Sequence, residues 1–340
     1  MTLRPGKLPA ALLAELLGTI THRDPRVLLG PGIGRDAAVI DIGGGRVLVA
    51  KTDPVTFAAE HIGWYTVNVN ANDIACMNAR PAWFMATALL PPGAPEALAR
   101  TIFQQLTSAC TALGIELVGG HTEITIGLNR PVIVGAMLGE AARDEIVLGE
   151  GVRPGDQVLL TKGIAIEGTA LLARESPSRL AATGLAPDVI ERAARMLYEP
   201  GISVVPEARA ICAAAHPRIM HDPTEGGIST ALYELAEAAG TTLRVNPAAI
   251  HVFEETRIVC DALGLNPMGL LASGALLAVI APEHCERITA ALTAMKIASQ
   301  VIATVESGAA RVIMVPEGST VPLPRFARDE IARFYEDAHG

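Results

Sequence analysis

Two kinds of apolar periodicity alternate along the chain, and their order predicts an α/β (α+β) fold. Runs of β-branched residues predict strands, while apolar positions three and four residues apart predict amphipathic helices. In the first part of the chain, Gly43-Gly44-Gly45 separates two strand-like runs and predicts a β-hairpin. The strands predicted there cover residues 37–42, 46–51, 85–90 and 132–138, and the helices cover 61–77 and 96–113.

A stretch rich in glycine, proline and charge at residues 148–156 interrupts this pattern. Strand character restarts directly after it, so we predict two domains, at residues 1–150 and 151–340. A length of 340 residues also exceeds what one hydrophobic core usually organises. In the second domain the predicted strands cover residues 157–161, 275–280, 300–305 and 311–315, and the helices cover 166–174, 203–215, 226–239 and 283–294.

Charge and cysteine content narrow the function classes. A net charge of −9 with scattered Lys and Arg argues against nucleic-acid binding, which needs clustered basic residues. The five cysteines are far apart and form no CxxC pair, which argues against a disulfide framework and favours a cytoplasmic location. Residues 8–20 are interrupted by Glu15 and predict an amphipathic helix rather than a signal peptide. No apolar run is long enough to predict a membrane span.

Acidic and amide side chains mark three segments of the first domain. Asp36 precedes the first predicted strand, Asp53 follows the second, and Asn72 with Asp73 lies in a predicted helix. Carboxylate oxygens are the ligands that magnesium prefers, and magnesium often bridges carboxylates to a bound polyphosphate. The three aspartates could form such a cluster. Alternatively, Asp36 and Asp53 are turn residues and Asn72 caps a helix.

A glycine pair followed by three polar side chains stands at residues 119–123. The run Gly119-Gly120-His121-Thr122-Glu123 follows two apolar residues that predict the end of a strand. Glycines let backbone N–H groups approach a phosphate closely, and the polar side chains could position a metal, a water or the reacting group. Alternatively, His121 is a loop histidine that makes internal hydrogen bonds.

A second glycine pair, Gly226-Gly227, begins a predicted helix and follows Asp222 and Thr224. A helix N-terminus after a flexible turn readily binds anions. The alternative is a capped helix start, with Asp222 or Thr224 as the capping residue. Lys162, at the end of a predicted strand, could also meet a phosphate, although a lysine in that position is usually solvated.

The segment Gly-Ile-Gly-Arg-Asp-Ala at residues 32–37 matches the GxGxxA pattern of dinucleotide-binding folds. That fingerprint needs a strand before it and a long helix after it, so that the helix N-terminus receives the pyrophosphate. Here a predicted hairpin follows instead. The sequence therefore disfavours a dinucleotide site of this type.

Seven motifs in order resemble the AIR-synthase-related superfamily, which includes PurM, the hydrogenase maturation protein HypE, thiamine-monophosphate kinase and selenophosphate synthetase. They run from residue 32 to residue 279: GIGRDAAVI, KTDPVTF, TVNVNANDIACMNARP, VGGHTEIT, VRPGDQVLLTK, HDPTEGGIS and ASGALLAV. The resemblance implies a PurM-like fold of two domains. The N-terminal domain would form a β-barrel across a homodimer, and a C-terminal α/β domain would complete the site.

The resemblance also implies ATP held through magnesium, with Asp36, Asp53 and Asp73 as metal ligands by position. His121 and Glu123 are the expected catalytic residues. The expected nucleotide-binding residues are Asn72, Gly119, Gly120, Thr122, Lys162, Asp222, Thr224, Gly226 and Gly227.

Three departures from the relatives bear on the substrate. HypE proteins end in a cysteine that receives the carbamoyl group, whereas this sequence ends in residues 334–340 without one, so that step is expected to lack its acceptor. Selenophosphate synthetases carry a reactive cysteine or selenocysteine in an N-terminal segment, and no cysteine precedes Cys76 here. Kinase and HypE relatives tend to carry an acidic residue where this chain has His121, so Glu123 could supply the missing ligand.

These features predict an enzyme that phosphorylates an oxygen of a small or protein-borne substrate from ATP. The segments at residues 119–123 and 221–227 resemble the HypE branch more closely, which favours activation of an amide or carbonyl oxygen. Two alternatives stay open: a small-molecule kinase of the thiamine-monophosphate kinase type, and a non-catalytic ATP-binding maturation or scaffold protein.

Overall fold

The computed structural model describes residues 6–21, 23–32, 34–315 and 319–336. Contacts between Cα atoms divide the chain into two compact units. The N-terminal unit comprises Asp24–Gly30 and Asp36–Ile146, and the C-terminal unit comprises Met1–Arg23, Pro31–Arg35 and Val147–Gly340. The division after Ile146 lies close to the boundary expected from the sequence. The first residues of the chain, however, group with the C-terminal unit.

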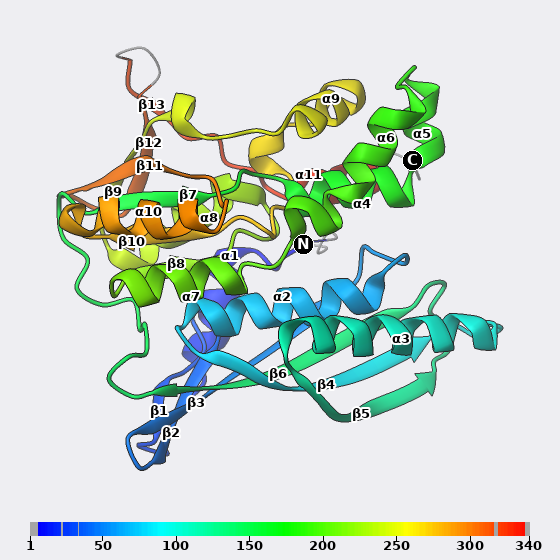
Figure 1. Ribbon diagram of the computed structural model, residues 1–340, viewed down its shortest axis with the longest axis horizontal. Coiled ribbons are helices and arrows are strands. Elements are labelled where there is room, and N and C mark those ends of the chain that lie inside the picture. Colours follow the sequence, from blue (N-terminus) through cyan, green and yellow to red (C-terminus); the bar gives the residue numbers. More distant parts are fainter. Residues whose placement is uncertain (1–5, 22, 33, 316–318, 337–340) are drawn as a thin grey trace. The chain divides into compact units, whose positions relative to one another are not determined.

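The N-terminal unit contains a six-stranded sheet in the order β1-β2-β3-β6-β4-β5 (Figure 1). Its neighbouring strands are antiparallel, except that β4 and β5 run parallel. The pairing of β2 with β3 confirms the predicted hairpin. The strands are β1 Val27–Leu29, β2 Ala38–Gly43, β3 Arg46–Val55, β4 Arg80–Leu90, β5 Glu116–Ile124 and β6 Val132–Ala142.

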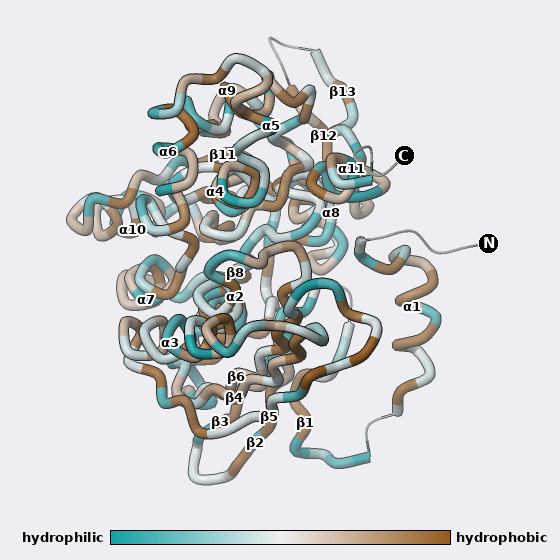
Figure 2. The backbone as a smooth tube through the Cα atoms, turned by 90° about the vertical axis from the view of Figure 1, so that its right-hand side faces the viewer, coloured by the Kyte–Doolittle hydropathy of each residue, from teal (hydrophilic) through white to brown (hydrophobic). Residues whose placement is uncertain are grey.

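Two helices, α2 Ile62–Cys76 and α3 Glu96–Leu113, cover one face of this sheet (Figure 1). Figure 2 shows both hydrophilic and hydrophobic residues in α3, and its buried side chains include Ile102 and Leu106. Burying each such side chain contributes about 1.5–3 kcal/mol. Helix α2 packs against α3, and a Cβ at Gly63 would come within 2.9 Å of the Ile102 carbonyl oxygen. The two helices can approach closely because residue 63 has no side chain.

The C-terminal unit contains a seven-stranded mixed sheet in the order β13-β12-β9-β11-β7-β10-β8. Only the pair β12 and β9 is parallel. The strands are β7 Gln157–Thr161, β8 Ile219–His221, β9 Thr242–Val245, β10 Leu277–Ile280, β11 Ser299–Glu306, β12 Arg311–Met314 and β13 Val321–Pro322.

Nine α-helices belong to the described part of this unit. They are α1 Ala10–Gly18, α4 Ile166–Glu175, α5 Pro177–Ala182, α6 Pro187–Arg195, α7 Val205–Ala214, α8 Gly227–Ala239, α9 Glu254–Leu263, α10 Cys285–Ala294 and α11 Glu330–Glu336. The expected helix at 283–294 begins with a 3₁₀ turn, Pro282–His284, and continues as α10. Helices α5, α6, α9 and α11 and strands β1, β9 and β13 were not predicted.

The C-terminal core lies between the sheet and α8. Leu277 and Val279, two residues apart in β10, point to the same face and share a buried cluster with Ile228 and Leu232 of α8. Met220 of β8 points to the opposite face, where its sulfur lies 4.0 Å from that of Cys212 in α7. The sheet therefore has helices on both faces, which matches the continuous apolar runs of its central strands.

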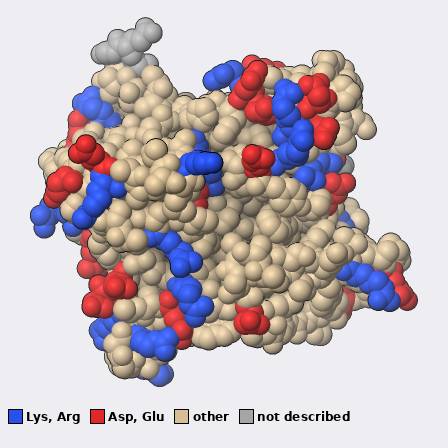
Figure 3. All heavy atoms as spheres, viewed as in Figure 1, with Lys and Arg blue, Asp and Glu red and all other residues tan. Residues whose placement is uncertain are grey.

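No described helix is long and apolar enough to cross a membrane. On the face drawn in Figure 3, lysine and arginine side chains lie among aspartate and glutamate side chains rather than in one basic area.

Candidate functional site

A charged cluster around Lys51 gathers the three predicted metal ligands of the N-terminal unit. Lys51 and Asp53 are two residues apart in β3 and therefore point to the same face of the sheet, which α2 covers. The Lys51 Nζ lies 3.1 Å from Asp73 Oδ2 and 3.7 Å from Asp53 Oδ2. The sequence singled out the aspartates and missed the lysine, although Lys51 stands in the same motif as Asp53.

The carboxylates of this cluster stabilise the charged form of Lys51. Burial opposes the charged form of Lys51, but Asp73, Asp53 and Asp36 outweigh it and raise the pKa of the Lys51 ammonium above its usual value. Three carboxylates around one ammonium leave an excess of negative charge. Carboxylate oxygens are the hard ligands that magnesium takes, so the donor set fits this ion.

Buried amides of α2 support the strand that carries Asp53. The Asn70 Nδ2 donates to the Asp53 carbonyl oxygen at 3.2 Å and to the Thr66 carbonyl oxygen at 2.8 Å. Asn72 is also fully buried, four residues before the helix ends, so its alternative role as a helix cap is wrong. Asp53 likewise does not end its strand, because β3 continues through Pro54 to Val55.

The segment at residues 119–123 is a strand rather than the expected loop. It forms most of β5, which pairs in parallel with β4 and is last in the sheet order. Gly120 has φ +148°, and a Cβ there would overlap the Ala86 carbonyl oxygen, whereas a Cβ at Gly119 would meet nothing within 4 Å. The approach of β4 therefore explains Gly120, and the sequence could not separate this cause from an approaching phosphate.

His121 and Glu123 lie on the same face of β5, with 3.4 Å between the His121 Nε2 and Glu123 Oε2. Their side chains are 66% and 56% exposed. Thr122, between them, points to the other face of the strand. The strand thus brings the two expected catalytic residues together in a setting open to solvent.

The second glycine pair forms a buried turn at the start of α8. Gly226, with φ +82°, is the N-cap residue, and no side chain makes a capping hydrogen bond from that position. Capping by Asp222 or Thr224 is therefore wrong. A Cβ at Gly227 would lie 2.5 Å from the Met268 carbonyl oxygen. Asp222 is buried, and Thr224 is partly exposed.

Charged groups stand beside this turn within the same unit. The His221 Nε2 lies 3.2 Å from Glu234 Oε2 on α8, and Lys7 Nζ lies 3.6 Å from Glu234 Oε1. Burial favours the protonated carboxyl, but His221 and Lys7 outweigh it and lower the pKa of Glu234. Lys7 Nζ also donates to Thr224 Oγ1 at 3.4 Å, so a cation reaches the turn from the start of the chain.

Lys162 does not face solvent, so the solvated alternative is wrong, while its phosphate contact stays a prediction. Its ammonium lies 2.6 Å from Glu207 Oε1 and donates to the carbonyl oxygens of Gly201 at 3.1 Å and Ser203 at 2.7 Å. Burial lowers the pKa of Lys162, and Glu207 opposes this shift. These three partners match the three donors of an ammonium, so Lys162 ties β7 to the segment before α7.

Models of known families match both units. The model described as AIR synthase related protein, N-terminal domain, covers residues 34–141, and the corresponding C-terminal domain model covers residues 153–315. The chain belongs to the AIR synthase related family. Its two-domain PurM-like α/β fold follows from this membership and from the structural likenesses below.

One curated relative and two solved structures are similar to this chain. Carbamoyl dehydratase HypE of Azotobacter vinelandii is 30% identical over 268 residues, which are 76% of this chain and 74% of the relative. A structure of HypE in complex with ATP has a TM-score of 0.71 at 23% identity and covers 91% of this chain and 92% of its own. A structure of AaThiL complexed with AMPPCP and TMP has a TM-score of 0.72 at 18% identity and covers 94% of each chain.

Proposed function

We propose that this chain binds ATP with magnesium and transfers the γ-phosphoryl group to an oxygen of its substrate. The observation that carries the proposal is the cluster of Asp36, Asp53 and Asp73 around Lys51. Membership of the AIR synthase related family and the likeness to carbamoyl dehydratases support it. The five cysteines are free, in agreement with the reducing cytoplasm in which we place the enzyme.

In this proposal the three aspartates would hold magnesium, which would supply positive charge to neutralise the phosphates during transfer. Lys51 keeps the carboxylates close together and offsets part of their repulsion. His121 accepts the proton that the substrate's amide nitrogen loses as the amide oxygen attacks, and Glu123 orients the imidazole. Asn72, Gly119, Gly120 and Thr122 are the proposed nucleotide contacts of the N-terminal unit.

The turn before α8 is the proposed phosphate-binding element of the C-terminal unit. An α-helix leaves its first N–H groups without intrahelical partners, and its dipole favours anions there. Gly226 and Gly227 themselves add no side chain to this end, while Asp222 and Thr224 supply polar groups next to it. Lys7, beside Thr224, adds positive charge.

We further propose that the phosphoryl group activates an amide or carbonyl oxygen, as the name carbamoyl dehydratase implies for the relatives. Release of ADP from ATP is measured with and without candidate amide substrates. Phosphate and a dehydrated product are expected. A stable phosphorylated product would favour a small-molecule kinase instead, and no substrate-dependent ADP would favour a non-catalytic ATP-binding protein.

We also propose a homodimer assembled through the N-terminal sheets. Strand β5 is the last strand of its sheet and carries the exposed apolar side chains of Val118 and Ile124, with Ile126 following. An unpaired edge of this kind is suited to pairing with a second copy. Sedimentation is expected to give a dimer. A stable monomer of 35.5 kDa at micromolar concentration would contradict this proposal.

A further inference from the structure

The segment before the last helix lies along the first turns of α8. The Ser229 hydroxyl donates a hydrogen bond to the Pro324 carbonyl oxygen. The Tyr233 hydroxyl donates one to the Leu323 carbonyl oxygen at 2.7 Å. The Arg325 guanidinium stacks over the Tyr233 ring, 3.8 Å from its centroid. Residues about 90 apart in sequence are thus joined at the start of this helix.

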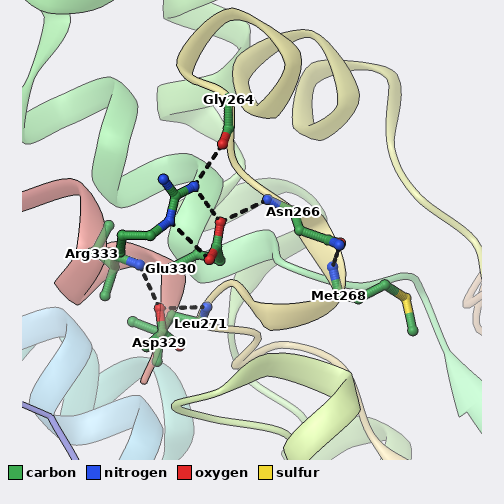
Figure 4. Close-up of polar contacts among 8 residues, drawn as sticks. Gly264, Asn266, Met268, Leu271, Asp329, Glu330 and Arg333 are labelled. Atoms are coloured by element: carbon green, nitrogen blue, oxygen red, sulfur yellow. Dashed lines mark hydrogen bonds and ion pairs between the residues drawn. The ribbon is translucent and has the colours of Figure 1, made fainter. Parts of the chain in front are cut away.

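Asp329 ends this segment, is 4% exposed and connects three pieces of backbone. Its Oδ2 accepts a hydrogen bond from the Gly226 N–H at 2.6 Å. Its Oδ1 accepts from the Leu271 N–H at 3.3 Å and from the Ile331 N–H, in its own helix, at 2.7 Å (Figure 4). One carboxylate oxygen therefore holds the glycine turn, and the other holds the segment on which that turn rests.

Gly226, the N-cap residue of α8, has no side chain of its own to cap the helix. The close approach of Gly227 to the Met268 carbonyl oxygen shows how tightly the turn sits on residues 268–271. Burial, with a contribution from Glu225, raises the pKa of Asp329 to about 7, while the three N–H groups oppose this shift. Burying a carboxyl group costs free energy, so a buried aspartate at this position indicates a specific role in the structure or the site.

We propose that Asp329 is a positioning residue that sets the Gly226-Gly227 turn for phosphate binding. The proposal rests on the proposed function of that turn. Asp329 does not touch the nucleotide in this account. It fixes the direction of the Gly226 peptide, and thereby the direction of the N–H groups that follow it at the start of α8. The C-terminal segment would thus complete a site formed more than 100 residues earlier in the sequence.

The neighbouring residue provides a matched control. Glu330 Oε2 accepts from the Asn266 N–H at 2.9 Å and pairs with Arg333, which also donates to the Gly264 carbonyl oxygen (Figure 4). None of these contacts involves the glycine turn. Asp329→Asn and Glu330→Gln are therefore isosteric changes in adjacent residues that stabilise different parts of the same unit.

In Asp329→Asn the amide oxygen can keep the two N–H groups that Oδ1 now receives, and the amide nitrogen then faces the Gly226 N–H as a second donor. ATP binding is measured by calorimetry with magnesium at pH 8. We expect the dissociation constant to rise about 10-fold or more in Asp329→Asn, the scale of one lost charge-assisted hydrogen bond. In Glu330→Gln it should stay within about 2-fold, because Glu330 makes none of its hydrogen bonds to the turn itself.

Amide hydrogen exchange at residues 226–229 supplies a readout that does not need the nucleotide. Faster exchange there in Asp329→Asn, and not in Glu330→Gln, is expected. Unchanged exchange and affinity in Asp329→Asn, or equal losses in both variants, would overturn the positioning role. The wild-type chain could fail to bind ATP while amide exchange at residues 226–229 still rises only in Asp329→Asn. In that case the proposed function is wrong, and the contact of Asp329 with the glycine turn is confirmed. If Asp329→Asn does not fold, Asp329→Ser retains a capping oxygen for Ile331 and answers the same question.

Discussion

The cluster around Lys51 and the His121–Glu123 pair on β5 contain the same kinds of groups in opposite settings. In the cluster, β3 and α2 hold the charges, and the Asp73 side chain is 5% exposed. On β5, one edge strand holds both residues, and both side chains are largely exposed. The fold therefore fixes the geometry of the cluster in advance. The exposed strand β5 constrains its two side chains less.

Substitutions of the two glycines of β5 test whether its backbone is as unconstrained as its exposed side chains. Gly120→Ala should lower the free energy of unfolding by about 3 kcal/mol or more, because a Cβ would meet the backbone of β4 at a positive φ. Gly119→Ala, its matched control, should stay within about 1 kcal/mol, since nothing lies near that position. Urea unfolding measures both. Equally small losses in both variants would show that the strand backbone is as unconstrained as its side chains.

Asp73→Asn removes the most buried charge of the cluster. Lys51 would lose its nearest carboxylate, so we expect a loss of about 1–3 kcal/mol in unfolding free energy. Asp53→Asn should cost less than about 1 kcal/mol, because that carboxylate is farther from Lys51 and more exposed. Thermal unfolding without nucleotide compares the two variants. A larger loss in Asp53→Asn would contradict the geometry described here.

Lys51→Met tests whether the Lys51 ammonium and magnesium neutralise the negative charge of the same carboxylates. Without the lysine, the carboxylates repel one another, so the variant should lose about 1 kcal/mol in EDTA and recover on addition of magnesium. Lys7→Met removes a lysine paired with Glu234 outside the cluster and serves as the control. The melting temperature in EDTA and in magnesium is the measurement. The same magnesium response in both variants would refute the idea.

His121→Asn should have the smallest effect on folding, within about 0.5 kcal/mol, as is usual for exposed side chains. If His121 is the general base, ADP formation falls about 100-fold while ATP binding stays unchanged. Retained turnover would make His121 a surface residue of β5 without a catalytic role.

The sequence predicted the fold class, the β2–β3 hairpin and the helices α2 and α3. Helix α3 buries its apolar positions with a regular period, whereas nearly all residues of α2 are buried. The sequence predicted β5 only in part, since an exposed edge strand with two glycines lacks a regular period. The approach of Asp73 to Lys51 depends on packing between α2 and β3, and the Asp329 contact joins residues 103 positions apart. Local patterns carry no signal for such contacts.

Lys162 and Asp329 show why a charged residue is hard to interpret from sequence alone. Both resemble solvated surface residues in the sequence, and both are buried with several partners. In each case the partners come from segments that local periodicity does not connect. Their burial depends on long-range packing, which a single sequence does not display.

The central claim is that the aspartates around Lys51 bind the magnesium of an ATP complex. Calorimetric titration of ATP into the wild-type chain and into Asp53→Asn, each with magnesium and with EDTA, tests it most directly. The account predicts tight binding by the wild-type chain only with magnesium, and an affinity about 10-fold or more lower in the variant, which folds normally. ATP affinity that is equal in both chains and indifferent to magnesium would contradict the claim.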